Sequence, residues 1–327
     1  MRALITGVAG QDGTLLSQML IADGFEVVGL VKPGHDTATL LSYAPSITLL
    51  SCDLGDPIQL ESMILDLQPD QIYNLGGISS LIEAAAHLEV TQRVNVGAVE
   101  AILSASRQLA SRNFKLRFVQ AASGTVFEGT EISPQDEFTP RSPVTPYAVG
   151  KARTLELIDA ARAEGLFATA AILYNHESPL RGEGFVTRRI TQGVARIAAG
   201  QQDFLELGNL DVSRDWGWAP DYVRAMRLML SAETPHDYVL GTGESHELKD
   251  FIQLAFKAAG ISDWHSLVRS NDDLRRHTDP TLLRGNSSRA YAELGWQHTK
   301  SFEEIAQSMV QYDQLLLDEP QALWHEA

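Results

Sequence analysis

A tyrosine and a lysine four positions apart are the residues best suited to chemistry, in PYAVGK at residues 146–151. At that spacing Tyr147 and Lys151 share one face of a helix, so the lysine charge can lower the pKa of the phenol. The tyrosinate can then remove a proton from a hydroxyl group while a hydride leaves to a redox cofactor. Ser123, in QAASGT at residues 120–125, is placed to hydrogen-bond the same hydroxyl. Because such pairs also occur on ordinary helix faces, and Ser-Gly is a common turn pair, the surrounding elements decide the interpretation.

A glycine-rich loop near the start of the chain supplies that context. TGVAGQDG, residues 6–13, follows an apolar run and opens an amphipathic stretch. Gly7, Gly10 and Gly13 permit a tight turn, close approach of backbone N–H groups to a pyrophosphate, and close packing of a helix on a strand. Gln11 and Asp12 stand between the last two glycines and are expected to contact the cofactor with them. The loop predicts a bound dinucleotide, and beside it the tyrosine–lysine pair is better explained as catalytic.

Cofactor selectivity is usually set at the end of the second strand, where an acid binds a ribose hydroxyl or a base accepts a phosphate. Lys32 is the base at this place, which favours NADP, while Asp36 lies a little further on and keeps NAD open. Asp53 and Leu54 after the third strand are expected to contact the cofactor, although Asp53 could equally be a turn residue. Leu75, at the end of the fourth strand, is expected beside the dinucleotide.

The first half of the chain alternates short apolar runs with amphipathic stretches, the pattern of strands and helices around a parallel sheet. The expected strands are residues 3–6, 26–31, 47–50, 71–75, 116–120 and 167–174. The expected helices are residues 13–23, 58–66, 94–112 and 147–164. This pattern predicts the α/β class, with a Rossmann-like, doubly wound parallel sheet.

The second half has a different texture, with loops rich in Gly, Pro, Arg and Trp. Helices are expected near residues 187–199, 222–231, 248–259 and 302–317. We expect a dinucleotide-binding domain over residues 1–172 and a smaller C-terminal substrate domain over residues 173–327. Part of the segment from about residue 208 to residue 240 is expected to pack back on the first domain.

Composition narrows the classes of partner. The 327 residues carry 26 Lys plus Arg against 42 Asp plus Glu, a formal net charge of −16. Non-specific binding to nucleic acid or to an anionic membrane needs a basic footprint that this balance opposes. No apolar run approaches the roughly 18 residues of a membrane span, and the start MRALITG has no signal-peptide pattern. With one cysteine, Cys52, the sequence indicates a cytoplasmic protein whose partner is a small molecule.

Together these motifs resemble a known family. The loop, the tyrosine–lysine pair and the preceding serine resemble the extended short-chain dehydrogenase/reductases that modify nucleotide sugars. Further segments are similar to signatures of the GDP-mannose 4,6-dehydratases. They are GQDG at residues 10–13, LYNHESP at 173–179, GFVTRRIT at 184–191, and LGNLD at 207–211 running on into RDWG at 214–217. The resemblance covers essentially the whole chain.

The resemblance also implies a set of substrate-binding residues for a GDP-sugar. They are Ser79, Asn175, Arg181, Thr187, Arg189, Arg214 and Arg276. Arginine presents a rigid fork of donors that suits phosphate oxygens, although any one arginine could instead be a surface ion-pair partner. The family further implies NADP as cofactor and a homodimer or homotetramer. No metal is expected, because His176 has no second ligand at zinc spacing and more simply orders its loop.

The family reaction is an internal redox cycle. Hydride leaves carbon 4 of the mannose to NADP, a glutamate removes the proton on carbon 5, water leaves carbon 6, and the hydride returns there. The family motif places that glutamate two residues after the catalytic serine or threonine, where this sequence has Thr125. A threonine hydroxyl has no useful basicity near neutral pH. Glu128, three residues further on, would need an altered loop to point inward.

Two other departures concern the cofactor and the sugar. After Lys32 the family has an arginine- and serine-rich stretch that contacts the cofactor phosphate and a neighbouring subunit, and this chain has the shorter PGHDT at residues 33–37. Ile78 stands where the family has glutamine. The leading hypothesis is a GDP-mannose 4,6-dehydratase. An epimerase or 4-ketoreductase acting on a GDP-sugar, which needs only the serine, tyrosine and lysine, is the alternative. A non-catalytic nucleotide-binding protein is disfavoured, because Tyr147 and Lys151 are both retained.

Overall fold

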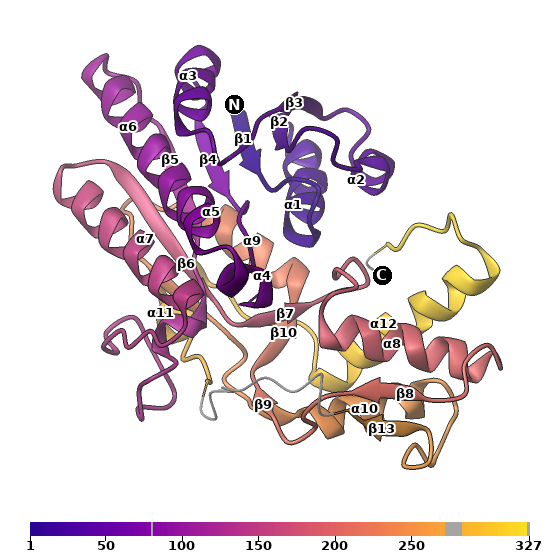
Figure 1. Ribbon diagram of the computed structural model, residues 1–327. Helices are drawn as coiled ribbons and strands as arrows, with labels where there is room; N and C mark the ends of the chain where they lie inside the picture. Colours follow the sequence, from indigo (N-terminus) through magenta and orange to yellow (C-terminus); the bar gives the residue numbers. More distant parts are fainter. Residues whose placement is uncertain (80, 272–282, 326–327) are drawn as a thin grey trace.

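The computed structural model describes residues 1–79, 81–271 and 283–325. Its larger part is a parallel sheet with helices on both faces, and its smaller part lies beyond the carboxyl ends of the strands (Figure 1). Among the described residues no helix is both long and apolar enough to cross a membrane.

The central sheet has seven strands, paired in parallel in the order β11-β6-β5-β4-β1-β2-β3. The strands are β1 (Arg2–Thr6), β2 (Glu26–Val31), β3 (Thr48–Ser51), β4 (Gln71–Asn74), β5 (Arg117–Ala121), β6 (Phe167–Leu173) and β11 (Tyr238–Leu240). The chain winds outward from β1 through β2 to β3, and then crosses to the other side of β1 for β4. That reversal makes the crevice between β1 and β4 the switch point at which such sheets bind ligands. The predicted Rossmann-like sheet is confirmed, and its six expected strands all form.

The helices of this part cover the sheet in two layers (Figure 1). They are α1 (Gln11–Ala22), α2 (Ala38–Tyr43), α3 (Pro57–Leu67), α4 (Leu81–Ala86), α5 (Leu88–Gln92), α6 (Ala98–Ser111), α7 (Pro146–Ala163), α9 (Ala219–Met229) and α11 (Ser288–Leu294). Successive strand residues point to opposite faces. Ala3 and Ile5 therefore pack in one core with α1 and α9, and Leu4 packs in the other with α3 and α6. The helix expected over 94–112 begins with a π-helical turn, Arg93–Gly97, before α6.

In the smaller part, the described residues form three helices and three two-stranded pairs. The helices are α8 (Val186–Ala198), α10 (Leu248–Ala258) and α12 (Phe302–Asp318). The pairs are β7 (Asn175–Glu177) with β10 (Trp216–Trp218), β9 (Ser213–Arg214) with β12 (His246–Glu247), and β8 (Leu205–Leu207) with β13 (Val268–Ser270). Their apolar faces form a third core, to which Trp216, Phe251 and Ile305 contribute. A buried ion pair of 2.6 Å between Arg188 and Asp313 ties α8 to α12.

Three elements from the second half, α9, β11 and α11, return to the first. Helix α9 packs on α1, and β11 pairs with β6 at the edge of the sheet. Strand β11 was not expected, because three residues are too few to show a period. Helix α9 begins three residues earlier than expected, with Pro220 in its first turn. Proline is tolerated there because a backbone N–H in the first turn has no partner within the helix.

Close packing of α1 on β1 gives a stability prediction at Gly13. A Cβ atom there would lie 2.5 Å from the Cα and carbonyl oxygen of Val8. We expect Gly13→Ala to lower the free energy of unfolding by about 1–3 kcal/mol, because backbone must move to admit the methyl group. Thermal melting without ligand measures the effect. Gly184→Ala is the control, since a Cβ at Gly184 meets open space, and equal melting temperatures for the two variants would contradict the prediction.

Candidate active site

The phosphate loop lies at the switch point of the sheet. Gly7 has a φ of +63°, and a Cβ at this position would lie 2.6 Å from the backbone of Gly76 after β4. The hydroxyl of Thr6 accepts from the N–H of Gly76 at 2.9 Å, which holds the two loops together. Gly10, which has no side chain, is the N-cap of α1. No side chain caps the first turn of α1, and the backbone N–H groups of such a helix N-terminus can bind the pyrophosphate of a dinucleotide.

The other predicted cofactor residues line the same edge of the sheet. Lys32 is exposed at the end of β2, while Asp36 accepts at 2.9 Å from the N–H of Ala38 at the start of α2. Asp53 is exposed and accepts from the N–H of Gly55 at 2.8 Å, as a turn residue does. Leu54 packs over the β4 loop, where a Cβ on Gly76 would lie 2.4 Å from its Cδ1. Leu75, in that loop, is partly buried.

The structure brings Ser123, Tyr147 and Lys151 together. Ser123 follows β5 and caps a short 3-10 helix, Gly124–Phe127. Tyr147 is in the first turn of α7, whose N-cap Thr145 accepts at 3.3 Å from the N–H of Ala148. Lys151 lies one turn later, with its Nζ 5.7 Å from the centre of the Tyr147 ring. That Nζ also donates to the carbonyl oxygen of Ala121 at 2.7 Å, which fixes α7 to the end of β5.

Burial dominates the pKa values of the pair. Burial raises the pKa of Tyr147 to about 12, and the opposing contributions come from a hydrogen bond with Ser123 and from the charge of Arg181. Burial also lowers the pKa of Lys151 to about 8. At Tyr147 desolvation outweighs the contributions of Ser123 and Arg181, and the expected effect of the Lys151 charge on the phenol stays a prediction. Ser123 and Arg181 are the groups that favour the tyrosinate.

Thr125 and Glu128 are both engaged with neighbouring groups. The Thr125 hydroxyl donates to Ser123 Oγ at 3.0 Å. Glu128 accepts from the N–H and from the hydroxyl of Thr145, each at 3.1 Å, so its carboxylate stabilises the N-terminus of α7. Its charge raises the pKa of Tyr147. In this arrangement Glu128 holds the helix that carries Tyr147, and Thr125 holds Ser123.

Arg181 is a predicted substrate residue whose charge acts on Tyr147. Its Nε lies 3.2 Å from a carboxylate oxygen of Glu177, and its guanidinium lies 3.6 Å from the centre of the Phe185 ring. The hydroxyl of Thr187 donates to the same Glu177 oxygen at 2.6 Å. Thr187 is 1% exposed, so it acts on Arg181 through Glu177.

The remaining predicted substrate residues lie apart from one another in the fold. Asn175 is exposed at the start of β7 and pairs with Trp216, two residues after Arg214. Arg189 lies beside β8, with Nη2 3.4 Å from the carbonyl oxygen of Glu206. Ser79 is exposed after β4, and Arg276 lies outside the described residues.

Sequence reasoning missed a buried pair that joins the two parts. His176 Nε2 lies 2.9 Å from Asp12 Oδ2, and the ring stacks on Tyr222 with 4.6 Å between ring centres. The signal was present in the sequence, because Asp12 stands in the phosphate loop and His176 in the segment LYNHESP. A link between residues 164 positions apart has no periodic signature, however.

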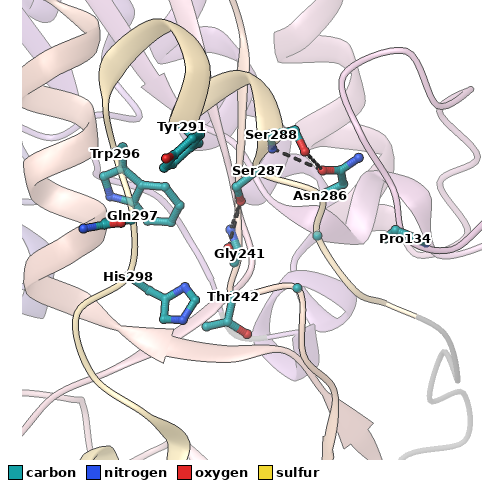
Figure 2. A pocket seen from close by; sticks show the side chains of 12 residues that line it. Pro134, Gly241, Thr242, Asn286, Ser287, Ser288, Tyr291, Trp296, Gln297 and His298 are labelled. Atoms are coloured by element: carbon teal, nitrogen blue, oxygen red, sulfur yellow. Dashed lines mark hydrogen bonds between the residues drawn. The ribbon is translucent and has the colours of Figure 1, made fainter.

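A separate pocket of about 390 Å³ opens beyond β11. Figure 2 shows Ser287, Tyr291, Trp296 and His298 around it. The carboxylate of Asp215 shapes one wall by accepting from the N–H groups of Thr242 and Gly243. Of the predicted catalytic, cofactor and substrate residues that the structure describes, none lines this pocket.

Known proteins match this chain along nearly its whole length. A family model described as GDP-mannose 4,6 dehydratase matches residues 4–309. GDP-mannose 4,6 dehydratase 1 of Arabidopsis thaliana is 37% identical over 323 residues, covering 95% of this chain and 89% of the relative. The GDP-mannose 4,6 dehydratase of Homo sapiens is 34% identical over 348 residues, covering 98% and 93%.

Solved structures share the fold at lower identity. UDP-glucose 4-epimerase of Thermotoga maritima, solved with UDP-glucose, has a TM-score of 0.85 at 21% identity and covers 97% of this chain and 100% of that chain. RMD of Pseudomonas aeruginosa, complexed with NADPH, has a TM-score of 0.78 at 24% identity and covers 96% and 99%.

The arrangement of Ser123, Tyr147 and Lys151 predicts the effect of Tyr147→Phe. We expect hydride transfer from a hydroxyl-bearing substrate to a nicotinamide cofactor to slow by about 100-fold or more, because the general base is removed. With a pKa of about 12 the wild-type phenol is mostly protonated at neutral pH, so the wild-type rate should rise with pH and the residual rate of the variant should not. Cofactor absorbance in single-turnover reactions measures both. Tyr291→Phe, at an exposed tyrosine, is the control, and a Tyr147→Phe rate equal to that of the control would contradict the assignment.

Proposed function

The chain belongs to the GDP-mannose 4,6 dehydratase family, and from this premise we propose that it is a nucleotide-sugar dehydratase that removes water from GDP-mannose. The observation that carries the proposal is the match of relatives with this name along nearly the whole chain. That match includes the elements that hold Ser123, Tyr147 and Lys151. Because the family is shown by sequence and the chemistry belongs to the site, the two arguments are independent.

Each residue of the proposed site has a separate role in the reaction. Tyr147 takes the proton from the hydroxyl on carbon 4, and Ser123 orients that hydroxyl. Lys151 fixes α7 to β5 through Ala121, and Arg181 supplies positive charge that favours the tyrosinate. The phosphate loop at residues 6–13 would hold a nicotinamide dinucleotide, which would supply the hydride transfer that these side chains cannot carry out.

For the substrate we propose contacts from two places in the smaller part. Asn175 and Arg181 are near His176 in the sequence, and His176 contacts the phosphate loop. Arg189, on α8, lies beside β8, and Arg214 is in β9. Their guanidinium groups suit the diphosphate of a GDP-sugar. Thr187 belongs to this set through Glu177. Ser79 and Arg276 remain proposed contacts to the sugar and the diphosphate.

For the cofactor we propose NADP. Lys32 is exposed at the end of β2, where a 2′-phosphate would lie. Asp36, the acid that could favour NAD, accepts a backbone hydrogen bond from Ala38. Structural relatives include one complexed with NADPH and others with NAD. The division at residues 1–172 and 173–327 and a homodimer or homotetramer are also proposals.

One observation favours a second candidate, an epimerase or 4-ketoreductase acting on a GDP-sugar. Thr125 occupies the position of the family's glutamate and donates to Ser123, while Glu128 is hydrogen-bonded to Thr145. Oxidation and reduction at carbon 4 need Ser123, Tyr147 and Lys151, whereas loss of water also needs a base for the proton on carbon 5.

The first experiment incubates the purified chain with GDP-mannose and either NADP or NAD. We expect a product lighter by one water, formed faster with NADP, and mass spectrometry of the sugar nucleotide detects it. Unchanged mass with altered stereochemistry, or consumption of NADPH with a 4-keto sugar, would favour the second candidate. Binding of the dinucleotide without any turnover would contradict both.

The second experiment restores a carboxylate at position 125. We expect Thr125→Glu to accelerate water loss by about 100-fold, since a positioned general base contributes at least that much. Thr125→Gln is the matched control, because it has the same size without basicity. If Thr125→Glu gives no acceleration while Glu128→Gln abolishes water loss, Glu128 is the base, and its stabilisation of α7 through Thr145 is a secondary role.

A further inference from the structure

Asp12 poses an electrostatic problem in the phosphate loop. It lies in the first turn of α1, between Gly10 and Gly13. The N-terminus of a helix attracts anions, and a carboxylate there would compete with the pyrophosphate of a dinucleotide and repel it. Asp12 side-chain exposure is 18%, so water does little to screen its charge.

Hydrogen bonds and the lowered pKa of Asp12 together indicate that its side chain is ionised. Gln11 Nε2 lies 3.2 Å from the carbonyl oxygen of His176, which can only accept, so this atom of the amide is the donor. The same Nε2 donates to Asp12 Oδ1 at 3.0 Å, and the hydroxyl of Ser178 donates to Gln11 Oε1 at 2.8 Å. Oδ1 of Asp12 is therefore an acceptor, and despite burial the nearby cations His176 and Arg181 lower the pKa of Asp12, which favours the carboxylate.

The same reasoning gives the ionisation state of His176. Its Nδ1 lies 2.7 Å from the carbonyl oxygen of Tyr174 and must carry a proton. Its Nε2 lies 2.9 Å from Oδ2 of Asp12 and donates to that carboxylate oxygen. With both ring nitrogens donating, His176 is an imidazolium. In agreement, the charge of Asp12 and the hydrogen bond to it raise the pKa of His176 despite burial, and the pKa of Asp12 is lowered.

The neighbouring charges also cancel in pairs. Arg181 is the next cation and lowers the pKa of both Asp12 and His176. Its own partner is Glu177, at 3.2 Å. The four groups therefore sum to zero net charge, and loss of His176 alone would leave one buried negative charge under the phosphate loop.

We propose that His176 is a positioning residue for the dinucleotide, whose imidazolium cancels the charge of Asp12 at the N-terminus of α1 and fixes β7 against the phosphate loop. The inference rests on the proposed function in one respect, that the ligand of this loop is a nicotinamide dinucleotide. Asp12 contributes its backbone N–H to the pyrophosphate site, and its side chain makes the link to β7.

Three variants separate charge from structure. His176→Gln removes the imidazolium and leaves the carboxyl group of Asp12 without its cation. Asp12→Asn removes both charges while keeping the hydrogen bonds, because the asparagine NH₂ donates to a neutral His176 Nε2 and its oxygen accepts from Gln11. The double variant Asp12→Asn with His176→Gln has neither charge and lacks the histidine ring.

The experiment titrates each purified chain with NADPH and with NADH, without any sugar, and follows binding by calorimetry. We expect His176→Gln to weaken the tighter dinucleotide by about tenfold, which corresponds to about 1.4 kcal/mol. Asp12→Asn should stay within about threefold of wild type, and the double variant should regain most of the loss. Thermal melting reports whether each chain is folded.

Two results would overturn the proposal. A double variant as weak as His176→Gln would mean that the ring acts by packing alone, and a tenfold loss in Asp12→Asn would mean that the carboxylate itself assists binding. Asp12→Asn still tests the proposal if the His176→Gln variant does not fold. If wild type binds neither dinucleotide, the proposal and the proposed cofactor fail together. If binding follows the expected pattern without water loss from GDP-mannose, only the proposed function fails.

Discussion

Backbone packs directly against backbone where β1 and β4 end, and the rest of the site depends on this close approach. Gly7 lies against Gly76, and Gly13 lies against Val8, at distances that admit no Cβ atom. The packing sets the direction of α1 and so aims its first-turn N–H groups at the crevice. Strands β5 and β6 continue the same edge toward α7, so Ser123 and Tyr147 lie within reach of a ligand that begins at the phosphate loop.

Much of this fold could be predicted because its elements have strong local signals. The six longer strands and the main helices alternate with clear periods, and proline or glycine marks several ends. Strand β11 could not be predicted, since three residues carry no period and β6 decides its pairing. In the site, the types and spacing of Tyr147 and Lys151 were enough to predict that the two side chains lie together. Their pKa values were not predictable, because burial by distant segments sets them.

The same distinction explains the contacts that sequence reasoning missed. From the sequence, Glu128 was considered only as a substitute base. Its hydrogen bonds to Thr145 depend on the folding of the segment between the two residues, which has no local sequence signal. The Asp12–His176 pair spans the two halves of the chain, and each residue alone has an ordinary local role. The net charge of −16 was similarly uninformative about the site, since buried groups there pair one cation with one anion. Long-range pairing is the information that composition and spacing lack.

The return of α9 and β11 to the first part restricts how this architecture can change. Helix α9 covers the apolar face of α1, and β11 closes the edge of β6. A chain cut near residue 172 would expose both an apolar face and an unpaired strand edge, which favours aggregation. The cofactor-binding half is therefore not a portable module that recombination can join to a different partner. New sugar preferences in such a chain must arise by substitution and loop exchange within one continuous gene.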